Sequence, residues 1–195
     1  VNNWILQGGG GMLNLEVESV DADYTVSAED FEEIEEVSLN MDFGAGQFTI
    51  TEEDIEDLIY VDATYPKNAD EPTLEANQSD DGVDIEFVSA NSRGFYLFSN
   101  ESKYDILLDT TDYLYDIDVN LGAGDGNLVL KSSQIRNLYG EVGAGKMEVE
   151  LGVDSTPTED VRFTVGAGKL KLVLPQRVGY QVEYDLGVGT IQIDG

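Results

Sequence analysis

The most constraining feature of the sequence is a short glycine motif that recurs five times. The copies read FGAG at 43–46, LGAG at 121–124, VGAG at 142–145, VGAG at 165–168 and LGVG at 186–189. The first glycines of the last four copies stand at positions 122, 143, 166 and 187, in steps of 21, 23 and 21 residues. A fixed period in this range is typical of folds that stack one unit on the next. A phosphate-binding loop is instead a single glycine-rich turn that opens a helix. No helical pattern follows any copy, so the motif indicates a structural corner.

The residues on either side of each motif alternate between apolar and polar. Around the second copy, Ile117, Val119 and Leu121 come before the glycines, and Leu128 and Leu130 follow them. Alternation with a period of two predicts strands with one buried face. The apolar positions change from odd to even numbers across the motif, so a bend or bulge must absorb one residue, which glycine tolerates. We therefore predict structural corners at Gly44, Gly46, Gly122, Gly124, Gly143, Gly145, Gly166, Gly168, Gly187 and Gly189. We also expect the small residue between each pair to point inward: Ala45, Ala123, Ala144, Ala167 and Val188.

These patterns predict an all-β fold: a single-stranded β-solenoid, similar to a β-helix, with repeated Gly-Ala-Gly corners. A short helical turn is expected near the N-terminus, because Ser27 is followed three residues later by Asp30 in a capping pattern. The chain of 195 residues is long enough for one substantial core. We expect residues 1–36 to form an N-terminal arm and cap, and residues 37–195 to form a single solenoid domain with irregular rungs at about 52–103.

Charge limits the partners that the chain can have. The sequence holds 40 Asp and Glu against 10 Lys and Arg, a formal net charge of −30. Such a surface repels nucleic acid and anionic lipid headgroups, so we expect neither as a direct partner. The sequence contains no run of 18 apolar residues, so we expect no membrane span within it. Hydrophobic residues make up 41 % of the chain, which is too many for a disordered acidic tail.

The available residue types argue against catalysis. The chain has no His and no Cys, which excludes the Ser-His-Asp, Cys-His and His-metal arrangements. Catalysis by a pair of carboxylates needs neither His nor Cys. Among 40 carboxylates, however, a close pair is expected by chance and does not indicate an active site. We therefore expect no enzyme, no catalytic residue and no cofactor-binding residue.

Oxygen atoms are the only ligands the chain can offer a metal, and they suit Ca²⁺ or Mg²⁺. The candidates for weak Ca²⁺ binding are Asp109, Asp112, Asp116, Asp118 and Asp125. Asp125 does not recur, since the equivalent positions of the other copies hold Gln47, Lys146, Lys169 and Thr190. A repeated calcium site is therefore disfavoured, and an acidic outer face is the preferred interpretation.

Three stretches resemble a known family. YDIDVNLGAGDGNLVLKSSQIRNLYGEVGAGKMEVELG and VRFTVGAGKLKLVLPQRVGYQVEYDLGVGTIQIDG resemble the toast-rack domain and the related "putative adhesin" domains of bacterial and archaeal envelope proteins. VSLNMDFGAGQFTI resembles the opening rung of that domain, so the resemblance covers about 37–51 and 104–195. It implies an extracytoplasmic, non-catalytic domain, at the cell surface or secreted and often attached to a membrane segment. It supplies no catalytic residues.

Two functions are then open. The first is a cell-envelope module, an adhesin or surface-sensing domain whose partner is another envelope protein. The second is a self-assembling subunit of a filament or surface array, joined by exchange of an N-terminal strand. The second interpretation depends on the uncharged stretch NWILQGGGGMLNL, in which Trp4, Ile5 and Leu6 precede four hinge glycines. This arm either caps its own first rung or adds to the edge of a neighbouring copy.

Overall fold

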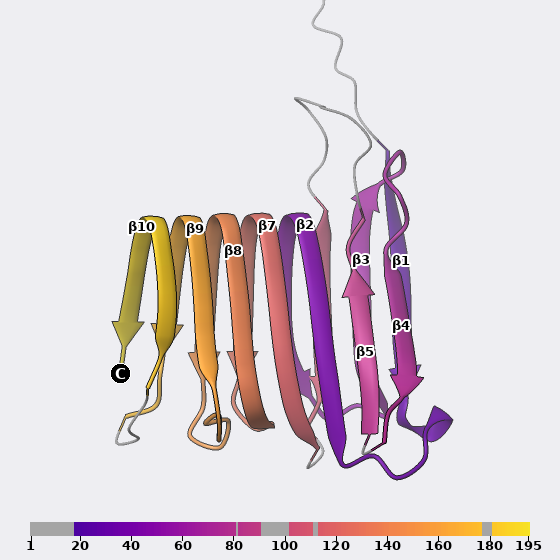
Figure 1. Cartoon of the computed structure of the whole chain (residues 1–195). Helices are drawn as coiled ribbons and strands as arrows, with labels where there is room; N and C mark the ends of the chain where they lie inside the picture. Colours follow the sequence, from indigo (N-terminus) through magenta and orange to yellow (C-terminus); the bar gives the residue numbers. More distant parts are fainter. Residues whose placement is uncertain (1–17, 81, 91–101, 111–112, 177–180) are drawn as a thin grey trace, which may run out of the picture.

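The computed structural model describes residues 18–80, 82–90, 102–110, 113–176 and 181–195, and these form an all-β molecule built on one open ten-stranded sheet (Figure 1). The strands are β1 (Ser19–Ser27), β2 (Glu36–Glu53), β3 (Asp57–Pro66), β4 (Thr73–Gln78), β5 (Gly82–Val88), β6 (Lys103–Asp109), β7 (Leu114–Leu130), β8 (Gln134–Leu151), β9 (Val161–Val173) and β10 (Glu183–Asp194). The expected helical turn is a single 3-10 turn, Ala28–Asp30, and the Ser27 side chain makes no capping hydrogen bond to it. In the part of the chain that the structure describes, no helix has the length and apolar content needed to cross a membrane.

Five long strands, β2, β7, β8, β9 and β10, run parallel in that order and carry the five glycine motifs in register. Ala123 of β7 lies opposite Ala45 on one side and Ala144 on the other, and Ala167 lies opposite Val188. Figure 1 shows that each of these strands rises on one side, bends at a common edge and returns on the other side. We call each such strand a rung. The halves of the rungs form two layers whose inward side chains meet between them.

The other half of the molecule is mainly antiparallel. The first half of β2 pairs with β5 and its second half pairs with β6, so each layer continues separately beyond β2. One layer ends with β4, which is antiparallel to β5. The other layer continues through β3 to β1, both antiparallel to their neighbours. Residues 52–103, where irregular rungs are expected, thus hold paired strands without a glycine motif, and Ser19–Ser27 forms an edge strand of the sheet.

Burial along the rungs follows the predicted change of parity. In β7, side chains are buried at odd positions from Tyr115 to Leu121 and at even positions from Gly126 to Leu130. The core is continuous, with an aromatic cluster where the two halves of the molecule meet. Phe43 stacks on Phe48 with ring centroids 4.1 Å apart, and both Phe87 and Tyr104 contact Phe43.

The expectation that the middle residue of each motif points inward is wrong. Ala45, Ala123, Ala144 and Ala167 are exposed, and Val188 retains 79 % of its accessible surface. The two glycines, rather than the residue between them, pack against the neighbouring rung. A Cβ atom on Gly143 would lie 2.5 Å from the carbonyl oxygen of Gly122, closer than real Cβ atoms come to an oxygen. The tight contacts at the bend therefore involve backbone only, and the middle side chain is directed to solvent.

Candidate functional site

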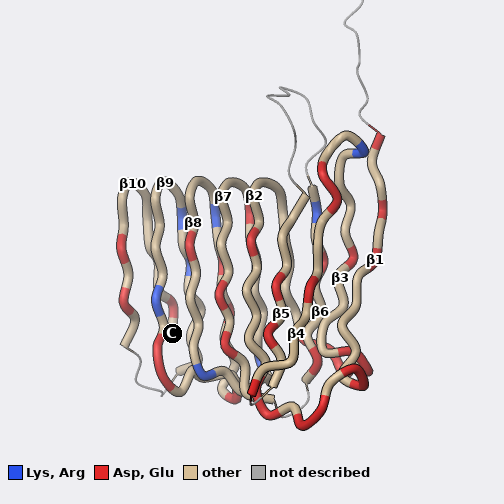
Figure 2. Tube along the Cα trace, turned by 45° about the vertical axis from the view of Figure 1, so that its right-hand side comes forward, with Lys and Arg blue, Asp and Glu red and all other residues tan. Residues whose placement is uncertain are grey.

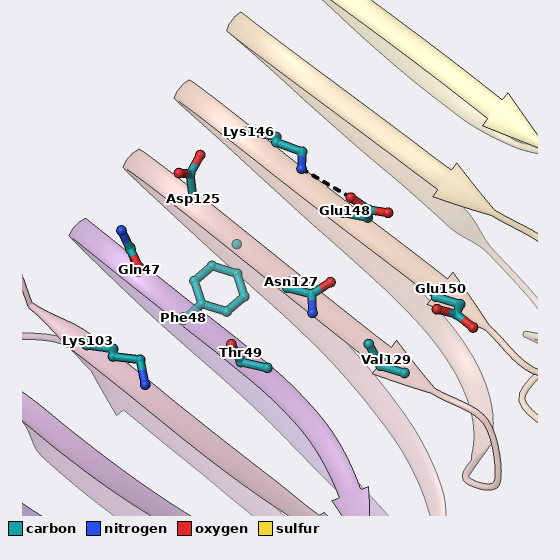
Figure 3. A pocket seen from close by; sticks show the side chains of 11 residues that line it. Gln47, Phe48, Thr49, Lys103, Asp125, Asn127, Val129, Lys146, Glu148 and Glu150 are labelled. Carbon is teal, nitrogen blue, oxygen red and sulfur yellow. Dashed lines mark ion pairs between the residues drawn. The ribbon is translucent and has the colours of Figure 1, made fainter.

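A groove of about 450 Å³ lies on the outer surface of the layer formed by β6 and the second halves of β2, β7 and β8 (Figure 3). Its lining consists of Gln47, Phe48, Thr49, Lys103, Asp125, Gly126, Asn127, Val129, Lys146, Glu148 and Glu150. The groove follows from alternation and register, because every second side chain points outward and parallel pairing aligns these side chains in rows. One row runs from Lys103 through Gln47 and Asp125 to Lys146. The next row contains Thr49, Asn127 and Glu148.

The floor of the groove is formed where a ring lies beside a glycine. Gly126 occupies an inward position, and a Cβ atom there would lie 2.5 Å from Cε1 of Phe48. The phenyl ring lies on the core side of the layer, in the space that a side chain at position 126 would fill. Gly126 therefore makes room for the buried ring of Phe48 beneath the groove.

Charged side chains of both signs line the groove, and several of them form ion pairs with each other or with residues next to the groove. Lys146 Nζ lies 3.1 Å from Glu148 Oε2, and Lys171 Nζ donates to Glu148 Oε1 at 2.6 Å. Hydrogen bonds from Lys171 and Lys146 hold the pKa of Glu148 below its usual range. Lys103 pairs with Asp105, and the hydrogen bond from its ammonium to this carboxylate raises the pKa of Lys103. The ion-paired ammonium groups of Lys103 and Lys146 thus stand in the same groove as the neutral polar groups of Gln47, Thr49 and Asn127.

Basic residues are concentrated near this surface. Lys146 and Lys169 face each other across β8 and β9, and Lys171 lies in the next outward row. Figure 2 shows few basic positions along the trace, most of them toward the β8 and β9 end. On the same layer at the opposite end, Asp62 lies between Asp23 and Asp105 in one row. The groove thus lies at the boundary between a basic and an acidic part of one surface.

An arginine clamp crosses the outer face of the other layer. Arg136 of β8 donates to Glu36 of β2 through Nη1 and Nη2, at 2.5 and 2.8 Å, and to Asp116 of β7 through Nε at 3.1 Å. Burial alone would raise the pKa of Asp116, but hydrogen bonds from Arg136 and Asn137 outweigh it and hold the pKa below its usual value. The carboxylate of Asp116 therefore already has a cationic partner, the guanidinium of Arg136, which links β2, β7 and β8.

The structure disperses the aspartates that are candidates for Ca²⁺ binding. Asp125 lines the groove, whereas Asp116 and Asp118 lie on the first half of β7, on the face with the arginine clamp. Asp109 is buried at the end of β6, and its Oδ1 atom has no hydrogen-bond partner among the described residues. Asp112 lies outside the described residues. Among the residues that the structure describes, no group of three or more Asp or Glu side chains is arranged to hold a metal ion, so Ca²⁺ binding stays a prediction.

Two features of the surface were missed by sequence reasoning. The Lys146–Lys169 pair follows from aligning the motif copies, because both lysines stand directly after the second glycine. The role of Glu52 has no comparable signal. Its carboxylate accepts backbone N–H bonds from Lys131, Ser132 and Ser133 at 2.6, 2.8 and 2.8 Å, and so ties the end of β2 to the turn between β7 and β8. The expected assembly residues Trp4, Ile5 and Leu6 lie outside the described residues.

Fold and surface together define an all-β domain with five long parallel strands and an exposed polar groove. The chain belongs to the family described as the N-terminal domain of toast_rack, DUF2154, whose model matches residues 15–173. The resemblance drawn from the glycine motifs is thereby confirmed.

A solved structure of another protein shows the same fold. A "putative cell adhesion protein" from Clostridium sporogenes ATCC 15579 has a TM-score of 0.74 at 18 % sequence identity, over 91 % of this chain and 99 % of that chain. A "putative adhesin" from Bacteroides fragilis NCTC 9343 is 15 % identical over 90 % of this chain and 97 % of that chain, with a TM-score of 0.30. The first likeness shows a shared fold, and the second is too low to carry an argument. No curated protein matches the chain significantly.

Proposed function

We propose that the chain is a non-catalytic, extracytoplasmic domain of the cell envelope, at the cell surface or secreted, that works as an adhesin-like module. In this proposal the parallel rungs form a β-solenoid with Gly-Ala-Gly corners, which holds the outer faces rigid. The observation that carries the proposal is the polar groove over β2, β7 and β8. The shared fold with a protein named for cell adhesion supports it.

The chemistry of the groove suits a neutral, hydroxyl-rich ligand such as an uncharged polysaccharide. The amides of Gln47 and Asn127 and the hydroxyl of Thr49 can each donate and accept hydrogen bonds. Lys146 adds donors and Glu148 adds acceptors, both of which bind sugar hydroxyls. The net charge of −30 repels polyanions at long range and leaves neutral chains unaffected.

The test compares one chemical change on two faces. Asn127→Leu removes a central hydrogen-bonding group of the groove, and Asn40→Leu makes the same change at an exposed position of the first half of β2, on the other face. On an array of neutral glycans, followed by calorimetry with the best binder, we expect Asn127→Leu to weaken binding on the order of tenfold, about the 1.4 kcal/mol of one good hydrogen bond. Asn40→Leu should bind as the parent does. Equal affinities of the two variants, or no binding to any neutral glycan, would contradict the proposal.

Self-assembly into a filament or surface array is the second candidate function. The observation that favours it is the edge strand β10, which exposes apolar side chains along its length. An exposed strand edge with apolar residues is a template for a further strand.

A further inference from the structure

Among the strands that the structure describes, β10 is an edge rung and pairs with β9 alone. Tyr184 and Leu186 of its first half are 55 % and 43 % exposed, and Ile193 of its second half is 48 % exposed. The equivalent residues of β9, Phe163, Val165 and Leu172, are buried because β8 and β10 flank them. One more rung on β10 would bury the edge in the same way.

The backbone of β10 accepts only a strand with glycines at two positions. From β7 to β10, each rung packs its glycine pair against backbone carbonyls of the rung before it: a Cβ atom on Gly166 would lie 2.8 Å from the Gly143 oxygen, and one on Gly189 would overlap the Gly168 oxygen. A rung added to β10 in the same register must therefore place glycines opposite Gly187 and Gly189. Inward apolar residues must also stand opposite Ile191 and Ile193.

Residues 4–17 meet these requirements. Their last nine residues, GGGMLNLEV at 9–17, align without a gap with GAGKMEVEL at 143–151 of β8. In this alignment Gly9 and Gly11 take the places of Gly143 and Gly145, and Leu13 and Leu15 take the inward places of Met147 and Val149. Upstream, Leu6 and Trp4 fall at the inward places of Gly140 and Leu138. The segment carries the sequence of a sixth rung.

We infer that residues 4–17 of one copy add to β10 of a neighbouring copy as a parallel rung, which joins copies head to tail. This inference rests on the self-assembly proposed above, and it specifies the contact, here called the joint, by which two copies would be held together. The expected pairs are Gly9 with Gly187, Gly11 with Gly189, Leu13 with Ile191, Asn14 with Gln192 and Leu15 with Ile193. Neither of the other sheet edges, β1 and β4, contains a glycine, so neither offers the same fit.

Geometry excludes addition to β10 of the same copy. Only one residue separates Val17 from Ser19, where β1 begins. In the sheet order, β1 and β10 are separated by seven steps between neighbouring strands, or roughly 34 Å at about 4.8 Å a step. Two extended residues span only about 7 Å. The acceptor must therefore be another molecule, and a rung so formed makes a heterologous contact that can repeat.

Charge favours this joint over other contacts between two copies of so acidic a chain. Residues 1–15 contain no charged residue, whereas the chain as a whole carries −30. The outward side chain opposite Gln192 would be Asn14, an amide beside an amide. In the same register Glu16, the one charged residue of 4–17, would lie opposite Asp194, so the joint brings together a stretch with a single charge and the apolar edge of the next copy.

Cross-linking tests the pairing directly, since the parent has no Cys. Asn14→Cys and Gln192→Cys chains are mixed in moderate salt and treated with a short bis-maleimide. We expect a linked dimer that forms from the mixture. Asn14→Cys mixed with Thr73→Cys, an exposed position on the β4 edge, should give no such product. No link to Gln192→Cys, or an equal link to Thr73→Cys, would overturn the inference.

Glycine variants in the arm supply the matched control. Gly9→Val and Gly11→Val place a side chain against a β10 carbonyl, and sedimentation over a concentration series should show monomers. Gly8→Val makes the same change one residue earlier, at the place that Val142 fills in β8, and should assemble as the parent does. Assembly of Gly9→Val would overturn the joint, and a parent that is monomeric at every concentration would overturn both the joint and self-assembly. Binding of neutral glycans to the groove, measured on Gly9→Val, reports on the adhesin-like function separately.

Discussion

In the second and third motifs, the second glycine is required for a reason that the first does not share. Gly145 has a φ of +145°, and Gly46 and Gly124 have φ values of +137° and +130°, a conformation that residues with a side chain rarely adopt. Gly143 has no such φ, and the carbonyl of Gly122 excludes a side chain there by contact. Both glycines thus allow the rungs to approach, and the second also adopts a backbone conformation that a side chain disfavours.

This difference predicts the effect of substitutions in the third motif. Gly143→Val should lower the free energy of unfolding by about 1–3 kcal/mol, because either the backbone or the neighbouring rung must shift. Ala144→Val should change it by less than about 0.5 kcal/mol, because this side chain is exposed and Val188 stands at the equivalent place in the fifth motif. Urea unfolding measures both. A Gly143→Val curve that overlays that of the parent would contradict the packing described here.

Two aspartates on one strand predict opposite responses to pH. Burial, and then the charge of Glu141, raise the pKa of Asp118, so the folded state binds its proton more readily than the unfolded chain does. Charged Asp118 therefore destabilises the fold at neutral pH, and this penalty disappears as the pH falls through the raised pKa. Asp116 has a lowered pKa, so its contribution is present above the unfolded pKa of 3.8 and is lost as the pH falls through the folded value.

Asp118→Asn should consequently be more stable than the parent at pH 7, by roughly 0.5 kcal/mol or less after solvent screening. The advantage should shrink as the pH approaches 4. Asp116→Asn should be less stable than the parent at pH 7, because the substitution removes the partner of Arg136. Urea unfolding at several pH values measures both differences. A destabilised Asp118→Asn at neutral pH would show that this carboxylate has a favourable partner.

At the scale of elements, Glu52 links strands that lie far apart in the chain. Its carboxylate accepts three successive N–H groups at 131–133, which otherwise have no strand partner at the turn after β7. Glu52→Ala should destabilise the fold by about 1–3 kcal/mol, since hydrogen bonds to a charged group are lost. Glu53→Ala, at the exposed neighbouring position, is the matched control and should have little effect. Equal melting temperatures for the two variants would argue against a structural role for Glu52.

The rungs could be predicted from the sequence because the pattern that identifies them lies within a few residues of each glycine motif. Alternation around each motif identifies strands, and the change from odd to even positions is confirmed by burial in β7. The orientation of Ala144 could not be predicted, since it depends on how closely the neighbouring rung approaches. The antiparallel strands β1, β3 and β4 have no repeat to reveal their partners. Likewise, the groove exists because register brings Gln47, Asp125 and Lys146 together from three rungs.

Across the whole molecule, parallel register turns a repeated sequence into rows of equivalent side chains. In the core this is favourable, since apolar residues stack on apolar residues through five rungs. On the surface it places like charges side by side, as in the row of Asp23, Asp62 and Asp105. With a net charge of −30, repulsion accumulates over the molecule and opposes the folded state more than the expanded unfolded chain.

Neutral salt should therefore stabilise the fold. The screening length falls from about 10 Å at 0.1 M to about 3 Å at 1 M salt, which weakens repulsion between rows more than the close ion pairs such as that of Lys171 and Glu148. The melting temperature should rise with NaCl and level off near 1 M, and KCl should give the same curve because screening depends on ionic strength. CaCl₂ at matched ionic strength separates screening from the Ca²⁺ binding predicted for the aspartates: a further rise in melting temperature supports a site, and coincident curves count against it. A melting temperature that falls as NaCl is added would show that attraction, rather than repulsion, dominates the electrostatics of the fold.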